Sequence, residues 1–111
     1  MAGMAQAKRR TIRGSKTGRP IMVLLDLMGR RWTLRIIWEL RGEALTSRAL
    51  RERCDDISPT VLQTRVGELR EAGFVELESP GGYQLSPLGR ELLATILPLH
   101  GFADRWEKGR E

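Results

Sequence analysis

One face of a predicted helix, in the segment ISPTVLQTRVGEL, carries small uncharged groups where a solvated helix would usually have Glu and Lys. They are Thr60, Gln63, Thr64 and Gly67. Short polar side chains read base edges in the major groove of DNA, and an amide such as that of Gln63 can bond bidentately to adenine. Gly67 would permit close approach of the backbone. The pattern is compatible with base reading, and also with a face that only contacts solvent.

The helix that carries this face is predicted to run from residue 58 to residue 72. Ser58 fits the N-cap and Pro59 the first helical position, and Gly73 suits the end of the last turn. At 100° per residue, the apolar side of this helix comprises Val61, Leu62, Val66, Leu69 and Ala72. Arg65 falls on that apolar side, so we expect its guanidinium to reach a carboxylate or a carbonyl at the core edge, because burying it unpaired would be costly.

The composition indicates one soluble globular domain. The chain has 111 residues, of which 41% are hydrophobic and 30% charged. Its longest apolar runs are far too short to span a bilayer, and its N-terminus lacks the apolar stretch of a secretory signal. These features predict a cytoplasmic protein without a membrane partner.

Catalytic chemistry is not indicated. The sequence shows no metal-ligand spacing, no phosphate-binding glycine loop and no nucleophile beside its single histidine, so we expect no enzyme, no metal and no other cofactor. Cys54 is interpreted as a small buried hydrophobe, although Arg51 and Arg53 nearby keep a redox role open. His100 is expected to pack in the last helix or at an interface.

The positive charge is concentrated in the N-terminal segment. Residues 1–19 hold six of the 19 Lys and Arg and no acidic residue, so the remaining 13 basic residues face 14 acidic ones. We predict a basic disordered arm over residues 1–18, followed by a domain over residues 19–111. Such an arm suggests a polyanionic partner, or it is only a solubilising tail. Its cations are Lys8, Arg9, Arg10, Arg13 and Lys16, followed by Arg19.

The remaining elements are predicted in the order helix, helix, helix, helix, hairpin, helix. The first three helices are expected over residues 20–28, 32–41 and 47–54, with Leu45 adding one residue of strand. Alternation in FVELE and YQLS around a Pro-Gly-Gly turn predicts a β-hairpin. The last helical region, residues 87–108, must break or kink at Pro98. This order predicts an α+β, mostly α, winged helix-turn-helix.

Three segments, in the right order and at the right spacing, resemble the HxlR-type winged helix-turn-helix transcriptional regulators, which are MarR-like. The segments are GRRWTLRIIWEL, ISPTVLQTRVGELREAGFVE and YQLSPLGRELL. The resemblance covers roughly residues 19–108 and implies a homodimer that binds operator DNA through the helix at residues 58–72. It also implies a two-stranded wing, N- and C-terminal dimerisation helices, and a nucleoid-associated location. A small-molecule effector is left open.

The sequence departs from this family in ways that affect sensing and electrostatics. Arg19 stands where many members carry a reactive cysteine, so thiol sensing by that route is not available. The predicted wing is also shorter than is common in the family, and its tip, ESPGGY, has no cation. We therefore hypothesise that the basic arm supplies the attraction to DNA that the wing lacks, as N-terminal arms in minor grooves do elsewhere.

Several further residues are expected at the DNA or at a dimer contact. Phosphate contacts, which position a protein without specifying sequence, are expected from Arg30, Arg31, Arg48, Arg51 and Ser58, with plain solvation of each arginine as the alternative. Surplus apolar residues on the first and last helices favour a homodimer, unless they fold back on the domain. The predicted interface residues are Ile21, Leu24, Leu92, Ile96, Leu99 and Trp106.

Two other functions remain open at this stage. The basic arm alone could make the protein a sequence-independent nucleic-acid binder of the chromatin type. The winged helix could also serve as an adaptor that binds protein. A preferred DNA site that depends on Gln63 would separate the first hypothesis, sequence-specific regulation, from the sequence-independent one.

Overall fold

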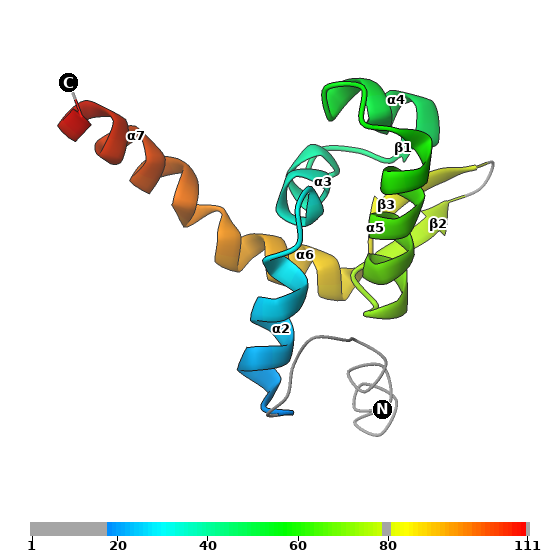
Figure 1. Ribbon diagram of the computed structural model, residues 1–111, viewed down its shortest axis with the longest axis horizontal. Coiled ribbons are helices and arrows are strands. Elements are labelled where there is room, and N and C mark those ends of the chain that lie inside the picture. The colour runs from blue at the N-terminus through cyan, green and yellow to red at the C-terminus, as the bar shows by residue number, and fades with distance from the viewer. Residues whose placement is uncertain (1–17, 79–80, 111) are drawn as a thin grey trace.

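The computed structural model describes residues 18–78 and 81–110 of the chain. The arm residues Lys8, Arg9, Arg10, Arg13 and Lys16 lie outside them. The elements are α2 (Pro20–Met28), α3 (Thr33–Glu39), β1 (Leu45–Thr46), α4 (Ser47–Arg53), α5 (Pro59–Glu71), β2 (Val75–Glu78), β3 (Gly82–Leu85), α6 (Pro87–Ile96) and α7 (Pro98–Arg110). The small sheet lies beside α5 at one side of the molecule (Figure 1), and the predicted α+β, mostly α, class is confirmed.

The helix starts follow the predicted capping chemistry. Ser58 Oγ accepts a hydrogen bond from the backbone N–H of Val61 at 3.2 Å, and Pro59 follows it at the first helical position. Ser86 Oγ accepts from the N–H of Gly89 at 2.9 Å. Each hydroxyl satisfies a backbone donor that has no partner within its own helix. Local sequence therefore sets where α5 and α6 begin.

The sheet has three antiparallel strands in the order β1-β3-β2. The wing hairpin itself, β2 with β3, is as predicted, with Val75 paired to Leu85. The third strand, β1, pairs Leu45 with Tyr83 and Thr46 with Gly82. A Cβ on Gly82 would lie 3.1 Å from the Leu45 carbonyl oxygen, so glycine permits this close approach. The sequence predicted one residue of strand at Leu45, and the structure extends this strand to Thr46.

One hydrophobic core joins the helices to the sheet. Its largest fully buried aliphatic side chains are Leu27, Ile36, Ile37, Leu40, Leu50, Leu62, Leu69 and Val66. α5 contributes one whole side to this core, because Leu62, Val66 and Leu69 follow its 3.6-residue period. The remaining sides of α5 are left to other contacts.

The last helical region divides at Pro98, as predicted. α6 ends at Ile96 and α7 begins at Pro98, since proline cannot continue the hydrogen bonds of the preceding turn. α7 extends away from the body of the molecule (Figure 1) and buries none of its residues. Near its start, the His100 ring stacks on Trp38 of α3, with ring centroids 5.8 Å apart.

Candidate nucleic-acid interface

α4 and α5 form a helix-turn-helix whose turn is held by arginines. Asp55 and Asp56 in the turn both have left-handed backbones, with φ of 56° and 57°. Arg51 Nε donates to the Ile57 carbonyl at 2.7 Å, and Arg35 Nη2 donates to the Arg53 carbonyl at 2.6 Å. Aspartate tolerates the left-handed conformation better than most residues, and the two arginines satisfy carbonyls that the turn leaves open. The orientation of α5 against α4 is therefore well determined.

The exposed face of α5 is the one predicted for base reading. Thr60, Gln63, Thr64 and Gly67 are all exposed, on the side away from the buried residues of the helix. Thr60, Gln63 and Thr64, with Pro59, line a recess of about 480 Å³. A Cβ built on Gly67 would meet no atom within 4 Å, so the backbone is open to a partner there. The structure thus brings the four predicted residues together on one accessible surface.

Gln63 is the member of this surface with defined side-chain partners. Its Nε2 donates to Ser47 Oγ, at the start of α4, over 3.0 Å. Its Oε1 accepts from the Tyr83 hydroxyl of β3 over 3.4 Å. The amide therefore joins α4, α5 and the sheet. Thr64, by contrast, turns its hydroxyl back to the carbonyl of Thr60 at 3.0 Å.

Arg65 lies off this surface, as its helical angle predicts. Its Nε donates to the Arg31 carbonyl at 2.8 Å and its Nη1 to Glu68 Oε1 at 3.1 Å. Glu68 Oε2 also forms an ion pair with Arg30 Nη1 at 2.8 Å. The Arg65 guanidinium thus binds both a carbonyl and a carboxylate at the core edge, which confirms its expected structural role. The cluster ties the α2–α3 connection to the side of α5.

The arginines expected at DNA phosphates differ in how available they are. Arg48 on α4 is 90% exposed, with a weak ion pair to Glu52 at 4.0 Å. Arg31 is exposed and lies 5.5 Å from the centroid of the Trp32 ring. Arg30 and Arg51 are half-buried, with partners in Glu68 and the turn. A phosphate role for the five expected residues, Arg30, Arg31, Arg48, Arg51 and Ser58, stays a prediction.

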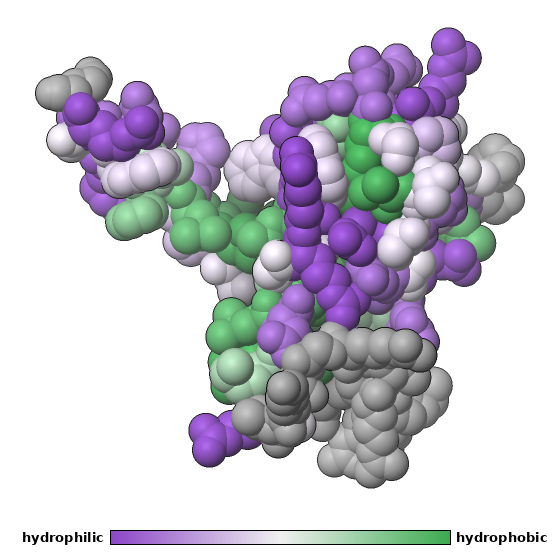
Figure 2. All heavy atoms as spheres, viewed as in Figure 1, coloured by the Kyte–Doolittle hydropathy of each residue, from purple (hydrophilic) through white to green (hydrophobic). Residues whose placement is uncertain are grey.

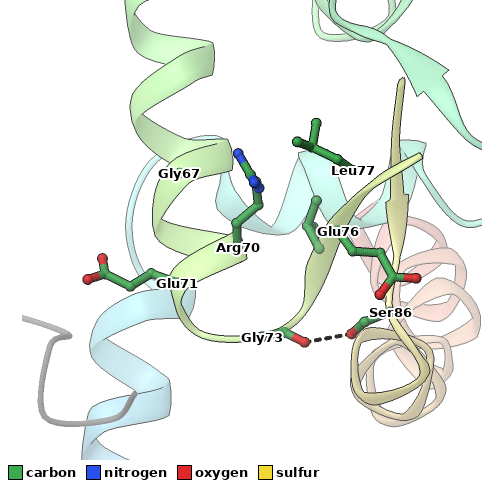
Figure 3. Close-up of a pocket in the computed structure, with 8 residues that line it drawn as sticks. Gly67, Arg70, Glu71, Gly73, Glu76, Leu77 and Ser86 are labelled. Atoms are coloured by element: carbon green, nitrogen blue, oxygen red, sulfur yellow. Dashed lines mark hydrogen bonds between the residues drawn. The ribbon is translucent and has the colours of Figure 1, made fainter. Parts of the chain in front are cut away.

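Arg70 is a cation that the sequence reasoning missed. It lies in a cleft of about 500 Å³ between α5 and β2, which is also lined by Gly67, Glu71, Gly73, Val75, Glu76, Leu77 and Ser86. Figure 3 shows its guanidinium in the space between the helix and the strand. The sequence could have indicated this position, because Arg70 follows Gln63 by seven residues, or about two helical turns. Arg70 therefore lies on the same side of α5 as Gln63.

The described part of the wing is acidic. Residues 75–78 and 81–85 include Glu76 and Glu78 and no Lys or Arg, and Gln84 Nε2 donates to Glu76 Oε1 at 3.0 Å. Like charge would repel DNA phosphates, so this hairpin is unsuited to bind a phosphate backbone by attraction. Any electrostatic attraction at this end must come from Arg70 or from other parts of the chain.

Other kinds of site find little support in the described residues. Cys54 is fully buried, and burial raises the pKa of its thiol, with Arg35 opposing that shift. The reactive thiolate is thus disfavoured, and the predicted packing role of Cys54 agrees with its burial. Among residues 18–78 and 81–110, no three His, Cys, Asp or Glu side chains cluster as metal ligands would. None of the described helices is both long and apolar enough to cross a membrane.

The residues predicted for a dimer contact lie on α2, α6 and α7. Ile21, Leu99 and Trp106 are 56%, 54% and 57% exposed, whereas Leu24 is half-buried. Leu92 and Ile96 are also half-buried and pack against the core of their own chain. Figure 2 shows hydrophobic surface over α2 and along α6 and α7, and a smaller hydrophobic area near α4 and α5. The exposed apolar surface of α2, α6 and α7 is therefore the more extended one in this view.

Comparison with known proteins agrees with this architecture. The family model described as HxlR-like helix-turn-helix matches residues 27–111. Quinone-bound YodB from B. subtilis superposes with a TM-score of 0.70 and 27% identity, covering 77% of this chain and 96% of that one. A MarR-family regulator from Enterococcus faecalis V583 shares the fold, with a TM-score of 0.70, 22% identity, and coverage of 88% and 97%.

A curated relative matches over a shorter part of its length. The diphtheria toxin repressor of Corynebacterium diphtheriae is 36% identical over 74 residues, which are 65% of this chain and 32% of that protein. The chain therefore spans only a third of this relative.

The fold and the α5 surface define a DNA-binding transcriptional regulator of the winged helix-turn-helix class. Within that class, the chain belongs to the HxlR-like helix-turn-helix family, because the family model covers most of its residues. Proteins of this family and fold are transcriptional regulators, which are not enzymes.

Proposed function

We propose that the protein is a homodimer that binds operator DNA by inserting α5 into the major groove. The observation that carries this proposal is the division of α5 into two sides. Leu62, Val66 and Leu69 are buried, which holds the helix rigidly, while the opposite side is accessible and uncharged near its N-terminus. Recognition helices read bases mainly with residues near their N-termini.

Within this surface, Gln63 is proposed to read adenine, and Thr60 and Thr64 a base edge or a thymine methyl. Gln63 supplies both a donor and an acceptor, which adenine requires in the major groove. Gly67 is proposed to give clearance for the DNA backbone or a base edge. Its missing side chain leaves open space at that turn.

Phosphate contacts are proposed from the cations around α5. Arg31 and Arg48 are the exposed members, and Arg70 in the cleft beside β2 is added to them. Arg30 and Arg51 would combine a phosphate contact with their present structural bonds. Ser58 caps α5, so a phosphate there would meet the remaining free N–H groups of the first turn.

The dimer is proposed to form through α2 and α7. α7 has 13 residues and none of them is buried. An isolated helix shorter than about 12–15 residues is marginal in water, so α7 needs a packing partner. The exposed Leu99, Phe102 and Trp106 provide an apolar surface for a second copy. Two α5 helices would then enter successive major grooves, about 34 Å apart.

The protein is also proposed to have a cytoplasmic, nucleoid-associated location. Its binding to DNA is proposed to be regulated by a small molecule. YodB, a structural relative, has been solved with a quinone bound. Quinones are therefore the first compounds to test as effectors. If one acts by thiol addition, it must reach Cys54, the single cysteine of the chain, which is buried. Release of DNA by a quinone in the wild type but not in Cys54→Ser would support that route.

Selection from a random pool of duplex DNA tests the proposed function. The full chain should enrich a site with two related halves, and Gln63→Ala should remove preference at one base pair in each half. Gln84→Ala makes the same change on the wing and should leave the preference intact. Equal binding to all sequences by the wild type would instead favour the sequence-independent binder that acts through the basic arm.

A further inference from the structure

We propose that Ser47 and Tyr83 are positioning residues that hold the Gln63 amide ready for adenine. This inference rests on the proposed function, in which Gln63 reads a base. It adds two residues, from α4 and from β3, that neither the sequence pattern nor the exposed surface of α5 identifies. Neither residue needs to contact DNA for this role.

The contacts come from two elements on different sides of Gln63. Ser47 Oγ accepts from Gln63 Nε2 at 3.0 Å, and the Tyr83 hydroxyl donates to Gln63 Oε1 at 3.4 Å. Tyr83 is only 9% exposed and lies on the central strand of the sheet, paired with both Leu45 and Leu77. Its ring is therefore held from two sides. The amide of an exposed glutamine is thus attached to a rigid support.

The hydrogen-bonding capacity of the amide leaves room for a base. A glutamine side chain has two N–H donors and two acceptor lone pairs. Ser47 and Tyr83 occupy one of each, so one donor and one acceptor remain. Adenine presents one acceptor, N7, and one donor, the N6 amino group, in the major groove. Gln63 can therefore keep its hydrogen bonds to Ser47 and Tyr83 and still donate one hydrogen bond to adenine and accept one from it.

The functional consequence is preorganisation. A free glutamine side chain loses rotamer freedom when it binds, and this loss weakens the interaction. A glutamine already held by two contacts loses less, and it also presents its amide in one orientation. The acidic wing would then serve recognition without contacting phosphate, because its strand β3 supports the side chain that reads the base.

Base discrimination is the measurement that tests this role. A duplex selected from a random pool by the wild-type chain serves as the probe, together with its single base-pair variants. Gln63→Ala should lower discrimination at one base pair per half-site by about tenfold or more, the scale of a bidentate contact. Tyr83→Phe and Ser47→Ala should each lower it at the same base pair by about threefold, with Ser47→Thr restoring it because the hydroxyl returns.

A double-mutant cycle separates positioning from general effects. In the Gln63→Ala background, Tyr83→Phe and Ser47→Ala should have no further effect on discrimination at that base pair, because the group they position is absent. Gln84→Ala, on the same strand as Tyr83, is the control. Thermal unfolding of each variant shows whether a change reflects loss of fold, and Ser47→Ala supplies an independent test if Tyr83→Phe is unstable.

The outcomes distinguish the inference from the function on which it rests. If Gln63→Ala changes discrimination at no base pair, base reading by Gln63 is wrong. If Gln63→Ala acts but neither partner variant does, or if their effects persist without Gln63, the positioning role is overturned. A uniform loss of affinity for all sequences in Ser47→Ala, or sharper discrimination, would also overturn it.

Discussion

α5 and α7 are helices of equal length, 13 residues each, that the chain treats in opposite ways. α5 buries Leu62, Val66 and Leu69 and exposes small polar groups, whereas α7 buries nothing and exposes Leu99, Phe102 and Trp106. The first is held by its own chain and offers hydrogen bonds to a partner. The second offers apolar area, and although its His100 ring stacks on Trp38 of α3, none of its residues is buried. The difference supports the proposal that the two helices have different partners, DNA for α5 and a second copy of the chain for α7.

The largest expected effect compares equivalent truncations in the two helices. Leu62→Ala should lower the free energy of unfolding by about 2–5 kcal/mol, because it leaves a cavity in the core. Leu99→Ala should change the stability of the separated chain by less than about 0.5 kcal/mol, as exposed positions usually do. Urea denaturation at protein concentrations too low for association measures both. Similar decreases in the free energy of unfolding for the two variants would contradict the difference inferred between α5 and α7.

A charge on α7 should abolish association rather than folding. Leu99→Glu places a carboxylate in the proposed apolar contact, where leaving it unpaired is costly. We expect a monomer in sedimentation at micromolar concentration and operator binding weaker by about 100-fold or more, since each protomer then binds one half-site alone. Lys108→Glu changes the charge of the same helix at a position away from Leu99, and it serves as the control. A Leu99→Glu dimer would refute α7 as the interface.

Deletion of residues 1–17 tests whether the α5 surface needs the basic arm. The deletion removes Lys8, Arg9, Arg10, Arg13 and Lys16. If these contact phosphates, the slope of log affinity against log salt should become shallower by up to about 4 per protomer, and affinity at low salt should fall. Preference between sequences should persist, because α5 is intact. An unchanged salt slope would exclude a role for the arm in binding.

Arg70→Ala should have the smallest effect. One lost phosphate contact should weaken binding to all duplexes alike, by a few-fold, and reduce the salt slope by about 1 per protomer. Glu71→Gln changes a neighbouring residue of the same cleft and should not weaken binding, since it removes an acid. Titrations of operator and random duplexes at several salt concentrations measure this. A change in sequence preference with Arg70→Ala would mean that the residue reads bases instead.

Much of the fold follows from signals within a few residues of each other. Ser-Pro pairs set the starts of α5 and α6, and Pro98 separates α6 from α7. The angular position of Arg65 predicted a structural role, which its bonds to Arg31 and Glu68 confirm. Each of these results depends on helix geometry, which repeats with the chain and can be read from the order of residues.

Contacts between distant segments were not predictable in this way. One residue of strand was predicted at Leu45, but its pairing with Tyr83 of β3 was not, and Gly82 permits the close approach of the two backbones. The cleft that holds Arg70 needs α5 and β2 side by side. A short polar residue such as Ser47 gives no local sign of its partner, since any exposed serine could be solvated.

The sequence by itself determined the helices, their caps and the uncharged face of α5, because side chains at helical spacing share a side whatever surrounds them. Only the tertiary structure decided what each polar group on that face touches. Gln63 and Tyr83 are 20 residues apart, and their hydrogen bond exists because the sheet packs beside α5. The direction in which a surface glutamine points depends on such neighbours, and folding alone brings them together.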